Sequence, residues 1–415
     1  MNKILVIKFG GTSLSTVDRI KNAAKIVAAA SAEGKKVIVV VSAMGNATDD
    51  LIKLSEAIDQ MPDRRELDAL MATGEQQSAT LMAMALQSLG CRATSFNGDQ
   101  SGILTNADFG NATIEKLELT ELSRQIKDDV IPVVTGFQGI AATGDTTTLG
   151  RGGSDITAIA LAAALHAERC DIYSDVDGIY SADPRVTKSA EKLKTISYAD
   201  MLELAKHGAQ ILNPRSVVLA MNANVPVRVR STFMPNDQGT LLTAENKGFN
   251  SFVGIATCTT LNCIEIDLDR LELGPTRSLR SFALHRLRTN RELHELLLHN
   301  GIDAEIIEAV RPHPFRILLL LKKADTARAI AVLNNTALAI RRFRIITDLA
   351  SITLVAIKMT AKYHVDALNS LTKHNIPITG RTWHNRRLTL LVPISMFAKA
   401  TDILHAEFAA LLKAA

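Results

Sequence analysis

The sequence lacks an uninterrupted apolar run of about 18 residues, the length that a membrane-spanning helix needs, and its first residues already alternate like a strand. They do not form the charged segment followed by a long apolar one that marks a signal peptide. The 4 cysteines show no short paired spacing of the kind that zinc sites use. These absences predict a cytoplasmic protein with reduced, structural thiols, no metal site of its own and no membrane association.

A nucleic-acid partner is also disfavoured, although the formal net charge is +4. Residues 1–249 hold 25 Lys and Arg against 29 Asp and Glu, whereas residues 250–415 hold 22 against 14, together with 8 of the 10 histidines. The positive charges of the second part are scattered and the chain has 1 tryptophan, so a basic patch with interleaved aromatic residues is missing. The asymmetry instead predicts two parts of different character.

The first part alternates short β-rich runs with longer Ala/Leu-rich runs. This order predicts a parallel sheet covered by helices on both faces, and ligands of such sheets bind at the carboxyl ends of the strands. The expected strands are 3–9, 35–43, 130–137 and 170–175, and the expected helices are 16–34, 73–90 and 154–167.

The second part begins after a run of turn-forming residues that starts at Pro235. From 261 to 346 the pattern predicts strand, helix, strand, strand, helix and strand, and a similar set starts again at 351. We therefore expect a βαββαβ unit used twice, and two domains that span 1–245 and 250–415.

KFGGTSL, from Lys8, follows the first strand and precedes a helix. Gly10 and Gly11 allow backbone N–H groups to approach a phosphate, which Lys8 could then reach; an ordinary strand-to-helix turn is the alternative. After the next strand, Ser42 and Thr48 could offer hydroxyls to a ligand, but capping of the following helix is the favoured interpretation of each.

TGEQQSATL predicts the start of a helix with Glu75 in its first turn, where the macrodipole stabilises a carboxylate. The same carboxylate could bind a substrate ammonium. In TLGRGGSD, three glycines form a bend, Ser154 is the expected N-cap of the next helix and Asp155 lies in its first turn. These roles leave Arg151 unexplained, and a guanidinium in a tight loop suits two-pronged recognition of a carboxylate.

SDVDGIYSADPR, from Ser174, ends another strand with an acid and a turn. Asp175 and Asp183 could engage groups of a nucleotide, and Arg185 could meet a phosphate. Taken alone, the segment is also compatible with an ordinary surface turn.

Together, KFGGTS, GEQQSATL, TLGRGGSD, YSDVDGIYSADPR and GAQILNPRSV closely resemble aspartokinases of the amino acid kinase family over residues 1–245. The doubled βαββαβ unit is similar to the paired regulatory ACT modules of these enzymes. The resemblance implies an α/β fold, namely an α/β/α sandwich with a mostly parallel sheet, followed by two ACT-like, ferredoxin-like units. It implies phosphorylation of the β-carboxylate of L-aspartate by ATP with Mg²⁺, the first step toward lysine, through diaminopimelate, and toward threonine and methionine.

The resemblance also implies residue roles. Lys8 would stabilise the transferring phosphoryl group and Asp155 would orient Lys8, as the catalytic pair. The substrate would contact Thr48, Glu75, Arg151 and Ser154. The nucleotide would contact Lys8, Gly10, Gly11, Ser42, Ser174, Asp175, Tyr180, Asp183, Arg185 and Gln210. The ACT-like units would form a homodimer or a higher homo-oligomer.

Two departures from the family pattern matter. Aspartokinases usually have a lysine where Gln210 stands, near the ATP phosphates. The Pro-Gly pair that helps to bind an inhibitory amino acid is absent from both expected turns, DRLELGPTRSL from Asp269 and KMTAKYHVDAL from Lys358. We therefore expect weak or absent feedback by lysine or threonine. The alternatives are a kinase of the same family for another acidic amino acid in a specialised pathway, and a non-catalytic nucleotide or amino-acid sensor.

Overall fold

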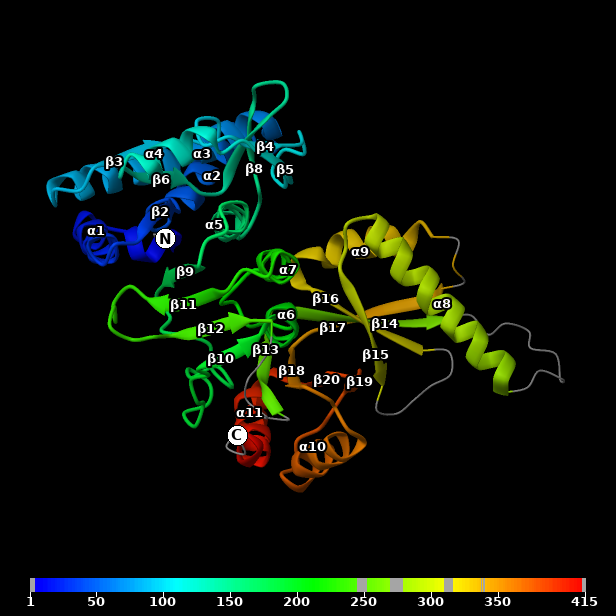
Figure 1. Ribbon diagram of the computed structural model, residues 1–415. Helices are drawn as coiled ribbons and strands as arrows, with labels where there is room; N and C mark the ends of the chain where they lie inside the picture. The colour runs from blue at the N-terminus through cyan, green and yellow to red at the C-terminus, as the bar shows by residue number, and fades with distance from the viewer. Residues whose placement is uncertain are drawn as a thin grey trace. The chain divides into compact units, whose positions relative to one another are not determined.

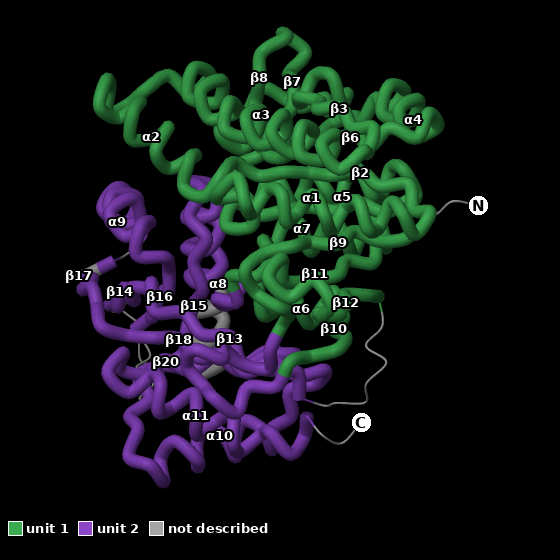
Figure 2. Tube along the Cα trace, turned by 90° about the vertical axis from the view of Figure 1, so that its left-hand side faces the viewer, with its two compact units in different colours: residues 1–179, 192–205, 210–248 green, residues 180–191, 206–209, 249–415 purple. Residues whose placement is uncertain are grey.

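A computed structural model of the chain describes residues 4–244, 252–268, 279–309, 316–336, 338 and 340–412. The chain forms two compact units, which we describe separately (Figure 2). Unit 1 contains residues 1–179, 192–205 and 210–248, and unit 2 contains residues 180–191, 206–209 and 249–415. Within the described ranges, no helix combines the length and apolar character that crossing a membrane requires.

Unit 1 is built on an 8-stranded sheet with the order β10-β12-β11-β9-β1-β2-β6-β3 (Figure 1). Every neighbouring pair is parallel except β11 and β12. The predicted mostly parallel sheet is therefore confirmed. The strands are β1 (Ile4–Phe9), β2 (Lys36–Val41), β3 (Ala93–Phe96), β6 (Ile131–Thr135), β9 (Arg169–Ser174), β10 (Thr195–Ser197), β11 (Val227–Ser231) and β12 (Thr240–Thr243).

Helices cover both faces of this sheet because its central strands bury side chains on both sides. On β1, alternate side chains from Leu5 to Phe9 enter the core under α1 (Val17–Ala32) and α3 (Arg64–Ser88). Lys8 points to the opposite face and meets α5 (Gly153–Ala164), which packs with α7 (Pro214–Ala223). The shorter helices are η1 (Gly11–Leu14), α2 (Ala47–Ile58), α4 (Thr120–Lys127) and α6 (Tyr198–Lys206).

A small separate sheet of unit 1 has the order β5-β4-β7-β8. Its strands are β4 (Ile103–Thr105), β5 (Ile114–Leu117), β7 (Gln138–Ala141) and β8 (Thr146–Thr148). β8 leads directly into the glycine-rich bend that precedes α5, so this sheet sets where the bend begins.

Unit 2 contains an 8-stranded antiparallel sheet with the order β13-β18-β20-β19-β15-β16-β14-β17 (Figure 1). The strands are β13 (Phe252–Cys258), β14 (Leu261–Leu268), β15 (Ala304–Ala309), β16 (Arg316–Lys322), β17 (Ile340–Ile346), β18 (Leu349–Ala356), β19 (Gly380–Trp383) and β20 (Arg387–Pro393). The helices are α8 (Leu279–His299), η2 (Lys323–Asp325), α9 (Thr326–Asn334), α10 (Ala361–Lys373), η3 (Ile394–Met396), α11 (Phe397–Phe408) and η4 (Ala409–Leu411).

The doubled unit is present, with one correction to its chain order. β14 to β17 form the first βαββαβ unit as predicted. The second unit takes its outer strand from β13, which pairs with β18 and precedes the first unit in the sequence. The expectation of two successive, self-contained units was wrong for this strand, because strand pairing is decided by contacts between residues about one hundred positions apart.

Candidate active site

The carboxyl ends of five parallel strands of unit 1 share one edge of the sheet. β11, β9, β1, β2 and β6 are neighbours in that order and run in the same direction. Hydrogen bonds join the first residue after a strand to the end of the neighbouring strand: Gly10 donates to the carbonyl of Tyr173 (2.9 Å), Ser42 to that of Phe9 (3.1 Å) and Gly136 to that of Val41 (2.9 Å). The predicted site residues that follow these strands therefore start from one edge.

The two glycines after β1 allow two loops to touch through their backbones. A Cβ on Gly11 would lie 2.9 Å from the carbonyl oxygen of Ala43 and 3.0 Å from that of Gly45. Instead, the Gly11 carbonyl accepts a hydrogen bond from the Gly45 N–H (2.9 Å). Any side chain at Gly11 would push the loop after β1 away from the loop after β2.

Lys8 and Asp155 form an ion pair at this edge. The Lys8 Nζ lies 2.7 Å from the Asp155 Oδ1, and each side chain is 11% exposed. Asp155 lies in the first turn of α5, as predicted. Since a buried charge without its partner is strongly destabilising, each residue holds the other in place.

Glu75 lies well inside α3, so the prediction that it occupies the first turn was wrong. The helix begins at Arg64, after Asp63 accepts hydrogen bonds from Arg65 and Glu66. Glu75 is 3% exposed, and its Oε1 accepts a hydrogen bond from the Ala43 N–H (3.0 Å). The macrodipole of the first turn therefore does not explain this carboxylate.

The second carboxylate oxygen of Glu75, Oε2, is buried and has no hydrogen-bond partner among the described residues. Burial raises the pKa of Glu75 to about 7, against the opposing effects of the Ala43 hydrogen bond and the charge of Lys8. A buried oxygen of this kind costs free energy unless a ligand supplies a donor. An ammonium group would satisfy it.

The bend before α5 depends on two left-handed glycines. Gly150 has φ +73° and Gly152 has φ +76°, and a Cβ on Gly152 would lie 2.4 Å from the Asn213 Cβ. Gly152 is the N-cap residue and Ser154 lies inside the first turn, so the prediction that Ser154 is the N-cap was wrong. Only 7% of Ser154 is exposed, because it packs against the backbone of Gly136.

Arg151 is exposed, and its guanidinium forms no hydrogen bond or ion pair with any part of the chain that the structure describes. Its backbone is fixed instead: Asn213 Nδ2 donates to the Arg151 carbonyl (2.8 Å). Arg215 donates to the Leu149 carbonyl (2.9 Å) and to Asn111 Oδ1 (2.7 Å). The Asn-Pro-Arg segment therefore braces the bend and leaves the Arg151 side chain available to a ligand.

Asp68 is a supporting residue that sequence reasoning missed. It is fully buried on α3 and accepts hydrogen bonds from the Thr148 N–H and hydroxyl (2.7 Å each) and from the Gly110 N–H (2.9 Å). Burial raises its pKa. Asp68 joins α3 to the strand that enters the bend, and its only sequence signal is an acid among the buried positions of an amphipathic helix.

Ser42 and Thr48 do not cap α2, so the capping interpretation was wrong for both. The N-cap position is Asn46, which makes no side-chain capping bond, and Thr48 is the second residue of the helix. Ser42 lies in the loop directly after β2.

The predicted nucleotide-contacting segment is divided between the units. Ser174, Asp175 and Gln210 belong to unit 1, whereas Tyr180, Asp183 and Arg185 belong to unit 2. The Asp183 Oδ2 lies 2.8 Å from an Arg185 guanidinium nitrogen. This interaction holds the pKa of Asp183 below its usual value.

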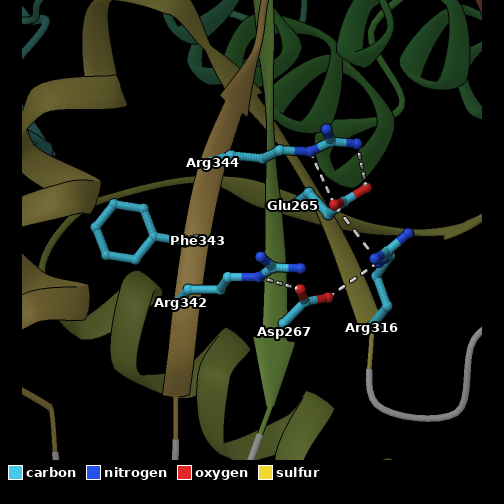
Figure 3. A pocket seen from close by; sticks show the side chains of 6 residues that line it. All are labelled: Glu265, Asp267, Arg316, Arg342, Phe343 and Arg344. Carbon is cyan, nitrogen blue, oxygen red and sulfur yellow. Dashed lines mark hydrogen bonds and ion pairs between the residues drawn. The ribbon is translucent and has the colours of Figure 1, made fainter.

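Unit 2 has a charged cavity of about 180 Å³ on the β14, β16 and β17 strands (Figure 3). Glu265 is bound by Arg344 (2.8 Å) and approached by Arg316 (3.5 Å). Asp267 is bound by Arg342 (2.7 Å) and Arg316 (3.0 Å). Each carboxylate thus already has two guanidinium partners, which is the pattern of a structural ion-pair network.

The chain is similar to known proteins over nearly its whole length. The profile described as "Amino acid kinase family" matches residues 3–231. An aspartokinase of Bacillus sp. (strain MGA3) is 39% identical over 414 residues, which cover 98% of this chain and 97% of that protein.

Two solved structures of E. coli aspartokinase III are also similar. The structure with aspartate and ADP, described as the R-state, has a TM-score of 0.81 at 25% identity and covers 98% of this chain and 99% of that one. The structure with lysine and aspartate, described as the T-state, has a TM-score of 0.75 at 26% identity with the same coverage.

Proposed function

The chain belongs to the amino acid kinase family, and we propose that it is an aspartate kinase. It transfers the γ-phosphoryl group of ATP to the β-carboxylate of L-aspartate and yields 4-phospho-L-aspartate and ADP. The relatives named aspartokinase, and the E. coli enzyme solved with aspartate and ADP, support this assignment.

The observation that carries the substrate class is the unsatisfied oxygen of Glu75 at the edge that also holds the Lys8–Asp155 pair. The ammonium of an α-amino acid would satisfy that oxygen, and the Arg151 guanidinium, which has no partner in the described part of the chain, would then bind the α-carboxylate in two-pronged fashion. Thr48 and Ser154 complete the contacts to the substrate. With the ammonium on Glu75 and the α-carboxylate on Arg151, the β-carboxylate is the remaining free group, and it faces the nucleotide.

The β-carboxylate needs no general base, because it is ionised at neutral pH. A new bond forms between its oxygen and the γ-phosphorus, and the bond from that phosphorus to the bridging oxygen of ADP breaks. The obstacle is repulsion between anions: at ~4 Å and an effective dielectric constant near 20 it amounts to ~4 kcal/mol, roughly a thousandfold in rate. Lys8, held by Asp155, and the N–H groups after β1 offset this charge.

The nucleotide would also contact Ser42, and its other expected contacts are Ser174, Asp175, Tyr180, Asp183, Arg185 and Gln210. In the described residues, no group of three or more His, Cys, Asp and Glu side chains is arranged to hold a metal ion. Mg²⁺ would therefore arrive with the nucleotide, since Mg²⁺ in such sites is bound mainly by phosphates and by one or two carboxylates. When bound, Mg²⁺ neutralises charge on the phosphate oxygens.

A hydroxylamine trap tests the function and the substrate together, because hydroxylamine converts acyl phosphates into hydroxamates, which form a coloured complex with ferric iron. With Mg-ATP, we expect the fastest hydroxamate formation from L-aspartate, and much slower formation from L-glutamate and from succinate, which lacks the ammonium. A faster rate with another acidic amino acid would reassign the substrate. ADP binding without any hydroxamate would identify a non-catalytic sensor.

Regulation and assembly remain part of the proposal. The E. coli relative binds lysine in its T-state structure, whereas this chain lacks the Pro-Gly pair at both expected turns. The segment from Asp269 lies outside the described residues, and the segment from Lys358 leads into α10. We expect a homodimer or a higher homo-oligomer through unit 2, and initial rates that lysine or threonine leaves nearly unchanged. Inhibition by either amino acid at sub-millimolar concentration would contradict that expectation.

A further inference from the structure

The segment 180–191 is built into the core of unit 2. Ala182 packs in the cluster that contains Phe252 and Phe408. The Ser181 carbonyl accepts a hydrogen bond from the Ile255 N–H (2.7 Å). The part of the predicted nucleotide-contacting segment that carries Tyr180, Asp183 and Arg185 is therefore held by unit 2, the expected regulatory part of the chain.

One face of α11 supplies three hydrogen bonds to this segment. The His405 Nε2 lies 2.9 Å from the Ser181 Oγ, and its Nδ1 lies 3.0 Å from the Ser189 Oγ. One turn earlier, Asp402 Oδ1 accepts a hydrogen bond from the Thr187 hydroxyl (2.7 Å). These contacts anchor the segment at Ser181, before Asp183, and at Thr187 and Ser189, after Arg185.

The His405 ring is fully buried, so both of its nitrogens depend on these serines. Burial lowers its pKa, against the opposing charges of Glu191 and Asp402. A neutral imidazole donates through one nitrogen and accepts through the other. The two serines satisfy both roles, and an apolar replacement would remove this contact from each serine and leave the buried Ser181 hydroxyl with only the Glu191 N–H as its partner (2.9 Å).

We propose that His405 is a positioning residue for the nucleotide: through Ser181 and Ser189 it fixes the segment that carries Tyr180, Asp183 and Arg185. The inference rests on the proposed function, which assigns nucleotide contacts to that segment. His405 itself does not touch the nucleotide. Its loss therefore weakens nucleotide binding and leaves aspartate binding intact.

The test compares His405→Leu with His405→Gln and with the matched control Ser370→Ala. The Ser370 hydroxyl donates to Glu407 Oε2 (2.7 Å), which joins α10 to α11 without touching the segment. We expect His405→Leu to raise the KM for ATP and the Kd for ADP about three- to tenfold, with the KM for aspartate within about twofold of wild type. His405→Gln, which keeps a donor and an acceptor, should recover most of the loss.

Ser370→Ala should lower the melting temperature without changing either nucleotide constant. The proposal is overturned if His405→Leu and Ser370→Ala behave alike, with lower stability and unchanged ADP affinity. Ser189→Ala combined with His405→Leu should cost no more ADP affinity than His405→Leu alone, because Ser189→Ala removes only a contact that His405→Leu has already removed; additive losses would also overturn the proposal.

Calorimetry with ADP alone keeps this inference separate from the proposed function. If the wild-type protein binds ADP but produces no hydroxamate, the kinase assignment fails and the His405 effect on ADP affinity still decides the inference. If the wild-type protein does not bind ADP, both proposals fail. Poor folding of His405→Leu leaves the same decision to His405→Gln and Ser189→Ala.

Discussion

Two charged regions of this protein resemble each other in composition and differ in how completely their charges are paired. At the carboxyl edge of unit 1, Glu75 keeps a buried oxygen without a partner, and the Arg151 guanidinium has none among the described residues. In the unit 2 cluster of Figure 3, Glu265 and Asp267 are each held by two arginines.

A charged side chain that lacks a hydrogen-bond or ion-pair partner is therefore a better guide to a ligand site than a cavity is. Buried polar groups are nearly always hydrogen-bonded, and an exception needs an explanation. At the unit 1 edge, the proposed amino-acid substrate would supply the missing partners. The unit 2 cluster lines a cavity, yet its carboxylates are already satisfied, so we interpret it as a support for the sheet.

Removal of the Lys8 charge should give the largest effect on kcat, and the same kind of change in the unit 2 cluster should give almost none. Lys8→Ala should lower kcat by up to about a thousandfold, because the ammonium that offsets most of the repulsion between the two anions is then missing. The matched change in the other cluster, Arg344→Ala, should leave kcat within about twofold of wild type. Steady-state rates and melting curves of both variants check this, and a folded Lys8→Ala enzyme with near-normal kcat would remove Lys8 from the mechanism.

Glu75→Gln should raise the KM for aspartate about ten- to a hundredfold, the range expected from loss of a charged hydrogen bond. The KM for ATP should change little, since Glu75 is assigned to the ammonium. In the wild-type enzyme, the KM for aspartate should also rise as the pH falls below about 7, because protonated Glu75 does not attract the ammonium.

In Glu75→Gln, the KM for aspartate should not rise at low pH.

The same pKa shift of Glu75 acts on stability: from pH 4.5 to about 7 the folded chain holds the Glu75 proton more tightly than the unfolded chain does. The Glu75 contribution to the free energy of unfolding therefore falls as the pH rises through that window. If the KM for aspartate still rises at low pH in Glu75→Gln, a group other than Glu75 causes that rise.

Asn213→Asp should have a moderate effect by loosening the bend. Asn213 Oδ1 accepts from the Arg215 N–H at the start of α7, and its Nδ2 donates to the Arg151 carbonyl. The aspartate keeps the cap and loses the donor, so we expect the KM for aspartate to rise about three- to tenfold. Asn213→Ala should add a loss of about 1 kcal/mol in stability from the missing cap. An unchanged KM for aspartate in both variants would show that Arg151 keeps its position without the hydrogen bond from Asn213.

Asp267→Asn should have the smallest effect, because it changes a carboxylate of the fully paired unit 2 cluster. Burial raises the pKa of Asp267, but hydrogen bonds from Arg342 and Arg316 outweigh it and hold the pKa below its usual value. Its contribution to stability is therefore present above the ordinary value of 3.8 and is lost as the pH falls below it. We expect a loss of less than about 1 kcal/mol at pH 7 and unchanged kinetic constants, measured by denaturant titration and initial rates.

Local patterns predicted the fold class, the strands β1, β2, β6 and β9 of the large unit 1 sheet and a set of candidate site residues, but not β3, β10, β11, β12 or the small sheet. β1, β2 and α5 are encoded by contiguous apolar runs, and the glycines after β1 and before α5 mark turns that few other residues can make. The start of α3 was missed because the sequence gives two acceptable starts, and Asp63 rather than Thr73 supplies the capping bonds. The strand β13 was missed because its partner, β18, lies far along the chain.

The sequence by itself determined the alternation of strands and helices, the chemistry available at each strand end and the candidate residues Lys8, Glu75, Arg151 and Asp155. Which of these groups are satisfied depends on the tertiary structure: Lys8 pairs with Asp155, whereas one buried oxygen of Glu75 and the Arg151 guanidinium have no partner among the described residues. The physical reason is that hydrogen bonding and burial depend on atoms brought together from distant parts of the chain, whereas turns and periodicity depend on neighbours in sequence.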